Sequence, residues 1–225
     1  MFFDPTFIIL IPALILAFYA QHKVRSTYYQ FLKVPSSSGR TGREVARAIL
    51  SRNNMDEVKV EMAEGILSDH YDPRTKVLRL SRDVYEGNSI SALGIAAHET
   101  GHAIQDHTGY APMRIRHQLV PVANVGTMAA FPLFILGIIF RMTALMDIGI
   151  LLFAGALVFQ LVTLPVEFNA SRNAMSELEK AGLVDPRDIA GGRKVLSAAA
   201  LTYVAAAAMT AASLIRLLLL RGSRD

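Results

Sequence analysis

Long apolar segments alternate with polar ones along the chain. The first, residues 6–20, carries no charge, and two longer ones cover residues 119–140 and 145–166 with a short polar stretch around Arg141 between them. A helix needs about 20 apolar residues to cross the hydrocarbon core of a bilayer, a length that the longer segments reach and the first nearly reaches. We therefore expect an N-terminal transmembrane helix and a transmembrane hairpin in the second half of the chain.

The two terminal segments need separate interpretation. Asp4, not a basic residue, precedes the first apolar segment and no small-residue cleavage site follows it, so the pattern favours an uncleaved anchor over a signal peptide. The last segment, residues 195–220, is rich in alanine, which contributes little to membrane insertion, and it contains Arg216. Because a long arginine side chain near a helix end can reach the interface, this segment is a weaker candidate for a further span.

Residues 22–118 are polar enough to form a folded domain outside the bilayer. Thr41 and Glu44 match a capping box at the start of a helix whose apolar residues fall on one face. Ser89 is expected to open a second helix, which ends near Gly109. Three short β-type runs lie between these helices, at 58–62, 65–71 and 76–81. The whole pattern predicts an α+β membrane protein, mainly helical, with a small antiparallel sheet and three or four transmembrane helices.

Composition narrows the chemistry that this chain can perform. Of its 225 residues, 52% are hydrophobic and none is cysteine. The absence of cysteine excludes disulfides and thiolate metal sites, so any metal must be held by His, Asp or Glu. The formal net charge of +4 comes from basic residues spread among acidic ones, without a basic tract interleaved with aromatic residues, so we expect no nucleic-acid partner.

The sequence IAAHETGHAIQDH, residues 95–107, contains the pattern H-E-x-x-H. Positions i and i+4 of a helix lie on one face, so His98 and His102 can bind one zinc ion. Glu99 points in another direction, where it can act as general base toward a zinc-activated water. The alternative is a helix whose polar side chains are merely solvated, since so short a pattern also occurs by chance.

A catalytic zinc ion has three protein ligands, so a third must come from elsewhere in the chain. His107 does not fit, because the metzincin pattern H-x-x-G-x-x-H needs glycine and histidine where the chain has Gln105 and Thr108. Glu167 is the better candidate, because two membrane crossings return the chain to the side of the H-E-x-x-H helix and a carboxylate at the membrane boundary needs a partner. The alternative is an interfacial Glu167 that pairs with Arg172.

Three segments together carry a resemblance to a known family: HYDPRTKVLRLS, AAHETGHAIQ and LPVEFNASRNA. Over nearly its whole length the chain resembles the YugP-type neutral zinc metallopeptidases of bacterial membranes, and it is more distantly similar to HtpX and CAAX-type membrane proteases. The resemblance implies a gluzincin-like zinc peptidase with His98, His102 and Glu167 as metal ligands and Glu99 as catalytic base. It also implies that a strand near the metal helix pairs with the substrate backbone. The HtpX group has an aspartate where this chain has Ser171, so no carboxylate acts there.

We accordingly expect five segments along the chain. They are an N-terminal transmembrane anchor (1–21), a cytoplasmic metalloprotease domain (22–118), a transmembrane hairpin (119–165), a cytoplasmic segment with the third ligand (166–194) and a C-terminal transmembrane helix (195–225). The expected location is the inner membrane of a bacterial cell, with the active site on the cytoplasmic side. The expected partners are the lipid bilayer and protein or peptide substrates, membrane proteins among them.

Two other functions are alternatives to a cytoplasmic zinc peptidase. A site-2-type intramembrane protease would place H-E-x-x-H inside a span, but the polar sequences SRDVYEGNS and QDHTGYAPMRIRH flank the motif. A zinc-stabilised membrane scaffold or chaperone would have no use for Glu99, because a structural zinc site needs no base and closes its fourth position. Peptide-bond hydrolysis by zinc-activated water is therefore the expected function.

The side of the membrane on which each segment lies can be tested with single cysteines, because the chain has none of its own. Basic residues near the spans favour the cytoplasm for 22–118 and 166–194 and the outside for the hairpin turn. In intact cells, an impermeant thiol reagent should label a cysteine placed at Thr143 but not one placed at Ser37 or Ser176. All three should be labelled after permeabilisation, and labelling of the latter two in intact cells would contradict the topology.

Overall fold

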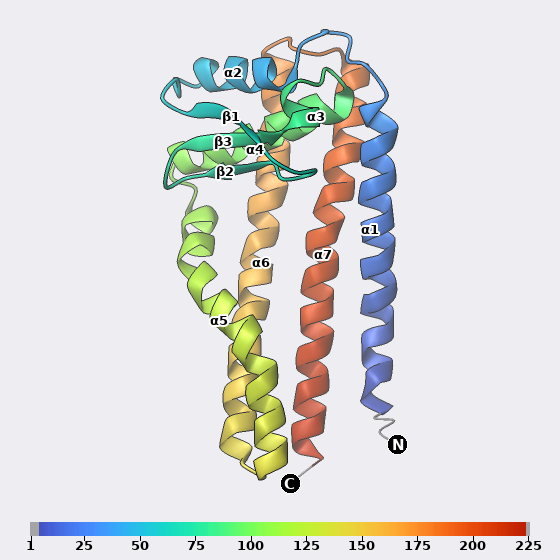
Figure 1. Cartoon of the computed structure of the whole chain (residues 1–225), viewed down its shortest axis with the longest axis vertical. Coiled ribbons are helices and arrows are strands. Elements are labelled where there is room, and N and C mark those ends of the chain that lie inside the picture. The colour runs from blue at the N-terminus through green and yellow to red at the C-terminus, as the bar shows by residue number, and fades with distance from the viewer. Residues whose placement is uncertain (1–4, 224–225) are drawn as a thin grey trace. The chain divides into compact units, whose positions relative to one another are not determined.

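The computed structural model describes residues 5–223 of the chain (Figure 1). Helices dominate it, and three short strands form one sheet, which confirms the predicted mainly helical α+β class. The elements in chain order are the 3-10 helix η1 (Pro5–Ile9), α1 (Leu10–Leu32), α2 (Gly42–Arg52), β1 (Lys59–Ala63), β2 (His70–Asp72), β3 (Val77–Ser81), α3 (Arg82–Tyr85), α4 (Ile90–His107), α5 (Ala111–Phe140), α6 (Thr143–Lys180) and α7 (Pro186–Gly222).

Four helical segments within the described residues are long and apolar enough to cross a membrane. They are Pro5–Leu32, Ala111–Phe140, Thr143–Lys180 and Pro186–Gly222. This agrees with the expected three or four spans, and it includes the alanine-rich C-terminal segment among the candidates. Asp4, on which the expectation of an uncleaved anchor partly rests, lies outside the described residues.

The chain divides into two compact units. Of the described residues, unit 1 contains 5–21, 114–165 and 201–223, and unit 2 contains 22–113 and 166–200. Helices α1 and α6 continue across the expected segment boundaries at residues 21 and 165, so composition changes there without a break in the helix.

Glycines in unit 1 let the two helices of the hairpin, α5 and α6, approach closely. A Cβ atom at Gly149 would lie 2.7 Å from the carbonyl oxygen of Ala130. One at Gly126 would lie 2.9 Å from the carbonyl oxygen of Leu152. Such backbone approaches are typical of helix pairs in membranes, where small residues allow close packing. The hairpin turns around Arg141, whose φ is 54°, and this confirms the turn predicted there.

The sheet of unit 2 is mixed, whereas the sequence predicted an antiparallel one. Its order is β1-β3-β2, with β2 antiparallel and β1 parallel to β3. The reason is the loop at 64–69, which carries the chain from β1 past β3 to the other edge of the sheet. The predicted strand over 65–71 begins only at His70, because Gly65 and Leu67 have positive φ angles of 95° and 55°, which an extended strand does not contain.

Helix α2 begins with the predicted capping box. The side chain of Thr41 accepts a hydrogen bond from the Glu44 backbone N–H, and the Glu44 carboxylate accepts one from the Thr41 backbone N–H. The predicted apolar face of the helix is buried, and it consists of Val45, Ala46, Ile49 and Leu50. Part of it packs with residues of β1, β3 and α4 in one apolar core. This core supports α4 from one side.

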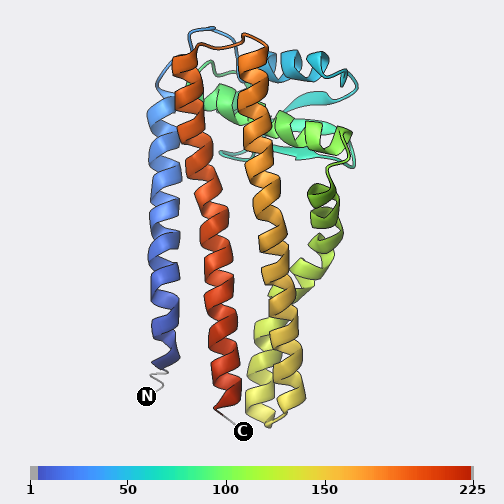
Figure 2. The same cartoon turned by 180° about the vertical axis from the view of Figure 1, so that it is seen from behind.

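Helix α4 lies between the sheet and the part of α6 that belongs to unit 2, as the two opposite views agree (Figures 1 and 2). Ser89 opens it as predicted, with its side-chain oxygen accepting a hydrogen bond from the Ala92 backbone N–H. The helix ends at His107, and Gly109 follows with a φ of 66°. Its middle is therefore enclosed by structure on both sides, and any site built there faces α6 or the sheet.

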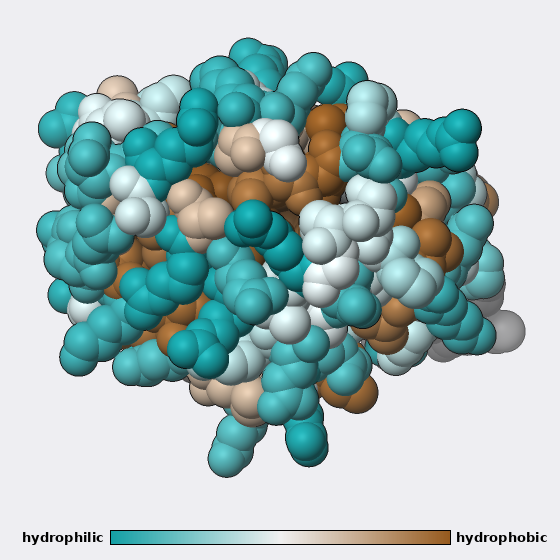
Figure 3. Space-filling view, turned by 90° about the horizontal axis from the view of Figure 1, so that it is seen from above, coloured by the Kyte–Doolittle hydropathy of each residue, from teal (hydrophilic) through white to brown (hydrophobic). Residues whose placement is uncertain are grey.

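The face seen in Figure 3 is mostly covered by hydrophilic residues, with apolar side chains visible between them. Surfaces of this kind are ordinary for the water-exposed parts of a protein, because apolar atoms still contribute much of any folded surface.

Candidate metal centre

Helix α4 holds His98 and His102 on one face, one helical turn apart. Their rings meet edge to face with centroids 4.8 Å apart. Both side chains are largely buried, with 14% and 10% of their surface exposed. The i and i+4 spacing therefore brings the two imidazoles together as the sequence predicted.

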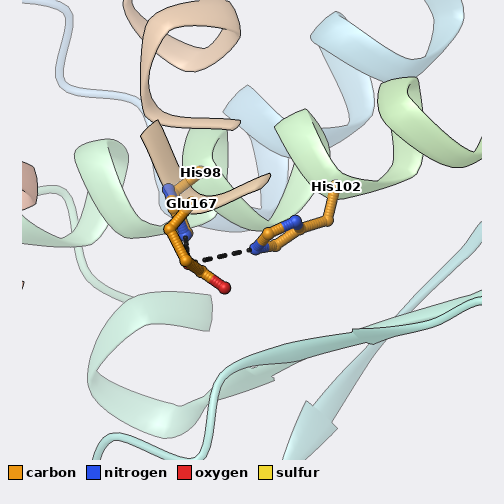
Figure 4. A group of neighbouring side chains, drawn as sticks. All are labelled: His98, His102 and Glu167. Atoms are coloured by element: carbon orange, nitrogen blue, oxygen red, sulfur yellow. Dashed lines mark ion pairs between the residues drawn. The ribbon is translucent and has the colours of Figure 1, made fainter. Parts of the chain in front are cut away.

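Glu167 on α6 joins the two histidines, as Figure 4 shows. One carboxylate oxygen, Oε2, lies 3.3 Å from His98 Nε2 and 3.6 Å from His102 Nε2. Glu167 is almost completely buried, with 2% of its side chain exposed, whereas Arg172, the alternative partner, is exposed. The predicted third residue thus meets the histidines although a complete helical hairpin separates it from them in the sequence.

The spacing of these three groups fits a zinc ion. One possible ligand atom from each residue lies within 4.8 Å of the other two. Ligands placed tetrahedrally at about 2.0–2.1 Å from zinc are about 3.4 Å from one another, close to the nitrogen–oxygen distances of this cluster. Two imidazoles and one carboxylate also form an established catalytic zinc set, which leaves a fourth position open. His98, His102 and Glu167 could therefore hold a zinc ion with room for a further ligand.

A glycine determines how closely α4 and α6 approach at this point. Gly101 lies between the two histidines in the sequence, and a Cβ atom there would be only 2.5 Å from the carbonyl oxygen of Ala170. The carbonyl carbon of the same alanine would be 3.1 Å away, so the obstacle is backbone that cannot rotate aside. Ala97 on α4 and Ala174 on α6 are small side chains buried in one apolar core. Gly101 therefore allows Glu167 to come within reach of the histidines.

Each imidazole also has a partner for its second nitrogen, and the H-E-x-x-H pattern predicts neither pairing. Nδ1 of His102 lies 3.0 Å from Gln105 Oε1, and Nδ1 of His98 lies 3.1 Å from Ser171 Oγ. The i and i+3 spacing could have suggested Gln105, since these positions share a helix face. Ser171 could not be found this way, because it belongs to another helix.

Acidic groups lie near His102 and near one another. Burial lowers the pKa of His102, but the hydrogen bond to Glu167 and the charges of Glu99 and Glu167 outweigh it, so that the pKa is raised above its usual value. Glu99 itself is buried, with 9% exposed. Burial raises the pKa of Asp69, hydrogen bonds from Ser81 oppose the change, and the charge of Glu99 raises the pKa further. The negative charge gathered here favours a bound cation.

His107 and the acidic residues near the end of α6 are not part of this group of possible ligands. His107 is exposed at the end of α4, as expected for a solvated histidine near a helix C-terminus. On α6, Glu177 accepts a hydrogen bond from Asn53 Nδ2 at 3.1 Å and forms an ion pair with Arg52, while Glu179 is exposed.

Comparison with known proteins agrees with this geometry. Residues 6–222 match a family described as "Putative neutral zinc metallopeptidase". The chain belongs to this metallopeptidase family. It is 47% identical over 210 residues to the "Putative membrane protease YugP" of Bacillus subtilis (strain 168), with 93% of each chain covered. No solved structure matches the chain. The family membership confirms the resemblance drawn from the sequence motifs.

Replacing Glu167 tests the third ligand. Glu167→Gln should weaken zinc binding by more than about 100-fold, beyond the 10–100-fold typical of groups that only support a ligand. Zinc affinity is measured by competition with a chelator, and Glu179→Gln on the same helix is the control that should bind like the wild type. Moving the carboxylate with Glu167→Ala and Phe168→Glu should not restore binding, because one position rotates it by about 100°. Wild-type affinity in Glu167→Gln would exclude this residue as a ligand.

Gly101→Ala should damage the metal centre without touching a ligand. The added methyl group meets the backbone of Ala170, so the helices must separate, a change that typically costs about 1–3 kcal/mol. Gly94→Ala on the same helix is the matched control, because its Cβ would meet Gly192 Cα at an ordinary 3.5 Å. Both variants gain the same intrinsic helix propensity of about 1 kcal/mol. Zinc affinity and thermal stability should fall only in Gly101→Ala; equal behaviour of the two would contradict the close-contact argument.

Proposed function

We propose that this chain is a zinc-dependent membrane peptidase that hydrolyses peptide bonds of protein or peptide substrates. The main support is that the two histidines of H-E-x-x-H and the buried Glu167, from a helix far along the sequence, lie next to one another. In the proposed enzyme His98, His102 and Glu167 hold the zinc ion. Membership of a metallopeptidase family supports the reaction type, and the four apolar helices together with the membrane protease relative support the location in a membrane.

The residues around the proposed ion have different roles in hydrolysis. Zinc, when bound, supplies a Lewis acid that acidifies water and polarises a carbonyl group. Glu99 follows His98 directly, and its side chain is rotated by about 100° from that ligand, so it does not compete for the metal. Its carboxylate accepts the proton of the attacking water and can pass it to the leaving amine. Burial of Glu99 and His102 keeps bulk water from screening these charges.

The active site is proposed to face the cytoplasm and not the lipid. The four membrane candidates found within residues 5–223 do not include α4, which carries H-E-x-x-H. A site-2-type intramembrane protease would place this helix inside the bilayer. The distribution of basic residues near the spans supports the cytoplasmic side, and the location of the proposed enzyme is the inner membrane of a bacterium.

Glu99→Gln separates catalysis from metal binding. The variant should keep its zinc, since no ligand changes, and should lose hydrolysis by at least about 10²–10⁴-fold, the usual contribution of a general base. Purified protein in detergent is assayed with an unfolded protein such as casein, and zinc content is measured on the same sample. Glu179→Gln, an exposed carboxylate substitution, should retain wild-type activity.

The same experiment decides between an enzyme and a zinc-stabilised scaffold. A scaffold has no need of a base, so wild type and Glu99→Gln would then behave alike in every assay. Substantial hydrolysis by Glu99→Gln would remove this residue from the mechanism. Proteins that accumulate on Glu99→Gln in cells, but not on wild type, would identify the substrates.

A further inference from the structure

Three amide side chains, the buried Gln105 and the partly buried Asn169 and Asn173, are linked by hydrogen bonds beside the candidate metal centre. Gln105 follows His102 by one turn of α4 and is only 1% exposed. Its side-chain nitrogen Nε2 donates to the backbone carbonyl oxygen of Val166 at 2.8 Å and to Asn169 Oδ1 at 2.9 Å. Asn173 Nδ2 donates to the same Asn169 oxygen at 3.2 Å. Gln105 on α4 is thus hydrogen-bonded to α6 beside Glu167.

The partners of Gln105 determine the orientation of its amide. A backbone carbonyl oxygen can only accept, so the group that faces Val166 must be the NH₂ of Gln105. Both hydrogens of this NH₂ are engaged by α6, and the amide oxygen is therefore turned toward His102 Nδ1 at 3.0 Å. A flipped amide would bring two oxygens against each other at Val166 and lose that hydrogen bond.

This orientation determines which ring nitrogen of neutral His102 carries the proton. An amide oxygen accepts only, so Nδ1 of the ring must carry a proton and donate it. In the neutral ring the lone pair then resides on Nε2, the nitrogen that lies 3.6 Å from Glu167 Oε2. That lone pair is the one that a metal ion between the two residues requires.

From this geometry we propose that Gln105 is the positioning residue of the metal centre. This inference rests on the proposed zinc-peptidase function. It holds His102 in the Nδ1–H tautomer and fixes the plane of the ring. Through Val166 it also ties that ring to the backbone immediately before Glu167. One side chain therefore sets the relative position of two ligands from different helices.

The other histidine provides an internal comparison. His98 Nδ1 faces Ser171 Oγ at 3.1 Å, and a hydroxyl group can either donate or accept. Ser171 accordingly accommodates both tautomers of His98 and does not select one. Loss of the Ser171 hydroxyl should therefore matter much less than loss of the Gln105 amide.

Gln105→Met keeps the length and volume of the side chain but removes its hydrogen bonds. We expect zinc affinity, measured by chelator competition on the full chain in detergent, to fall about 10–100-fold. Ser171→Ala, the matched loss of the other Nδ1 partner, should reduce affinity by clearly less. Wild-type affinity in Gln105→Met, or an equal loss in Ser171→Ala, would overturn the proposal.

A cobalt(II) spectrum distinguishes positioning of the ligand from support of the fold. With the site saturated by cobalt, Gln105→Met should show altered visible d–d bands, because the His102 ring is no longer held, and Ser171→Ala should resemble the wild type. A purely structural role would lower stability and leave the saturated spectrum unchanged, which would overturn the proposal. If instead the wild type itself fails to bind zinc or cobalt through His98, His102 and Glu167, the proposed function fails before this inference is reached.

The wild type supplies a further measurement should Gln105→Met not fold. In zinc-loaded protein with ¹⁵N-labelled histidine, the Nδ1 proton of His102 should be present and should exchange with solvent more slowly than that of His98, because it is bonded to a buried amide. An Nδ1 proton on His102 that exchanges as fast as that of His98, or coordination through Nδ1, would overturn the proposal.

Discussion

The contact between the backbones of α4 and α6 at Gly101 and Ala170 is the constraint on which the candidate metal centre depends. A zinc ion accepts its ligands only within a few tenths of an ångström, at about 2.0–2.1 Å for nitrogen and about 2.0–2.2 Å for carboxylate oxygen. A side chain larger than hydrogen at position 101 would push α6 away from α4 and carry Glu167 away from the two histidines. Here a glycine faces a carbonyl oxygen, and His98, His102 and Glu167 all lie within one turn of that contact.

The sequence predicted those parts of the fold that depend on local pattern and on topology. The pair His98 and His102 follows from helix periodicity, and Glu167 follows from the even number of apolar segments between it and the motif. The mixed sheet could not be predicted, because it depends on where β1 docks and on the positive φ of Leu67, a residue type that rarely signals such a turn. Local patterns therefore specify elements, and long-range contacts specify their pairing.

Gln105 illustrates the same limit within the site. In the sequence, Gln105 shows only that the chain lacks the glycine that the metzincin pattern requires at this position. Its contacts with Val166 and Asn169 join positions that no local pattern relates, since a whole helical hairpin intervenes. A polar residue with 1% exposure is costly to bury unless every hydrogen bond is made, and the three contacts of Gln105 account for its position.

The three proposed ligands are synthesised in two steps that are far apart along the chain. A ribosome completes α4, with both histidines and Glu99, before it has made any of the hairpin α5–α6, and Glu167 emerges only after the turn at Arg141. Until then the nascent chain offers two metal ligands where a catalytic zinc ion requires three. In the proposed peptidase, the third ligand is therefore made last, after α5 and the first part of α6.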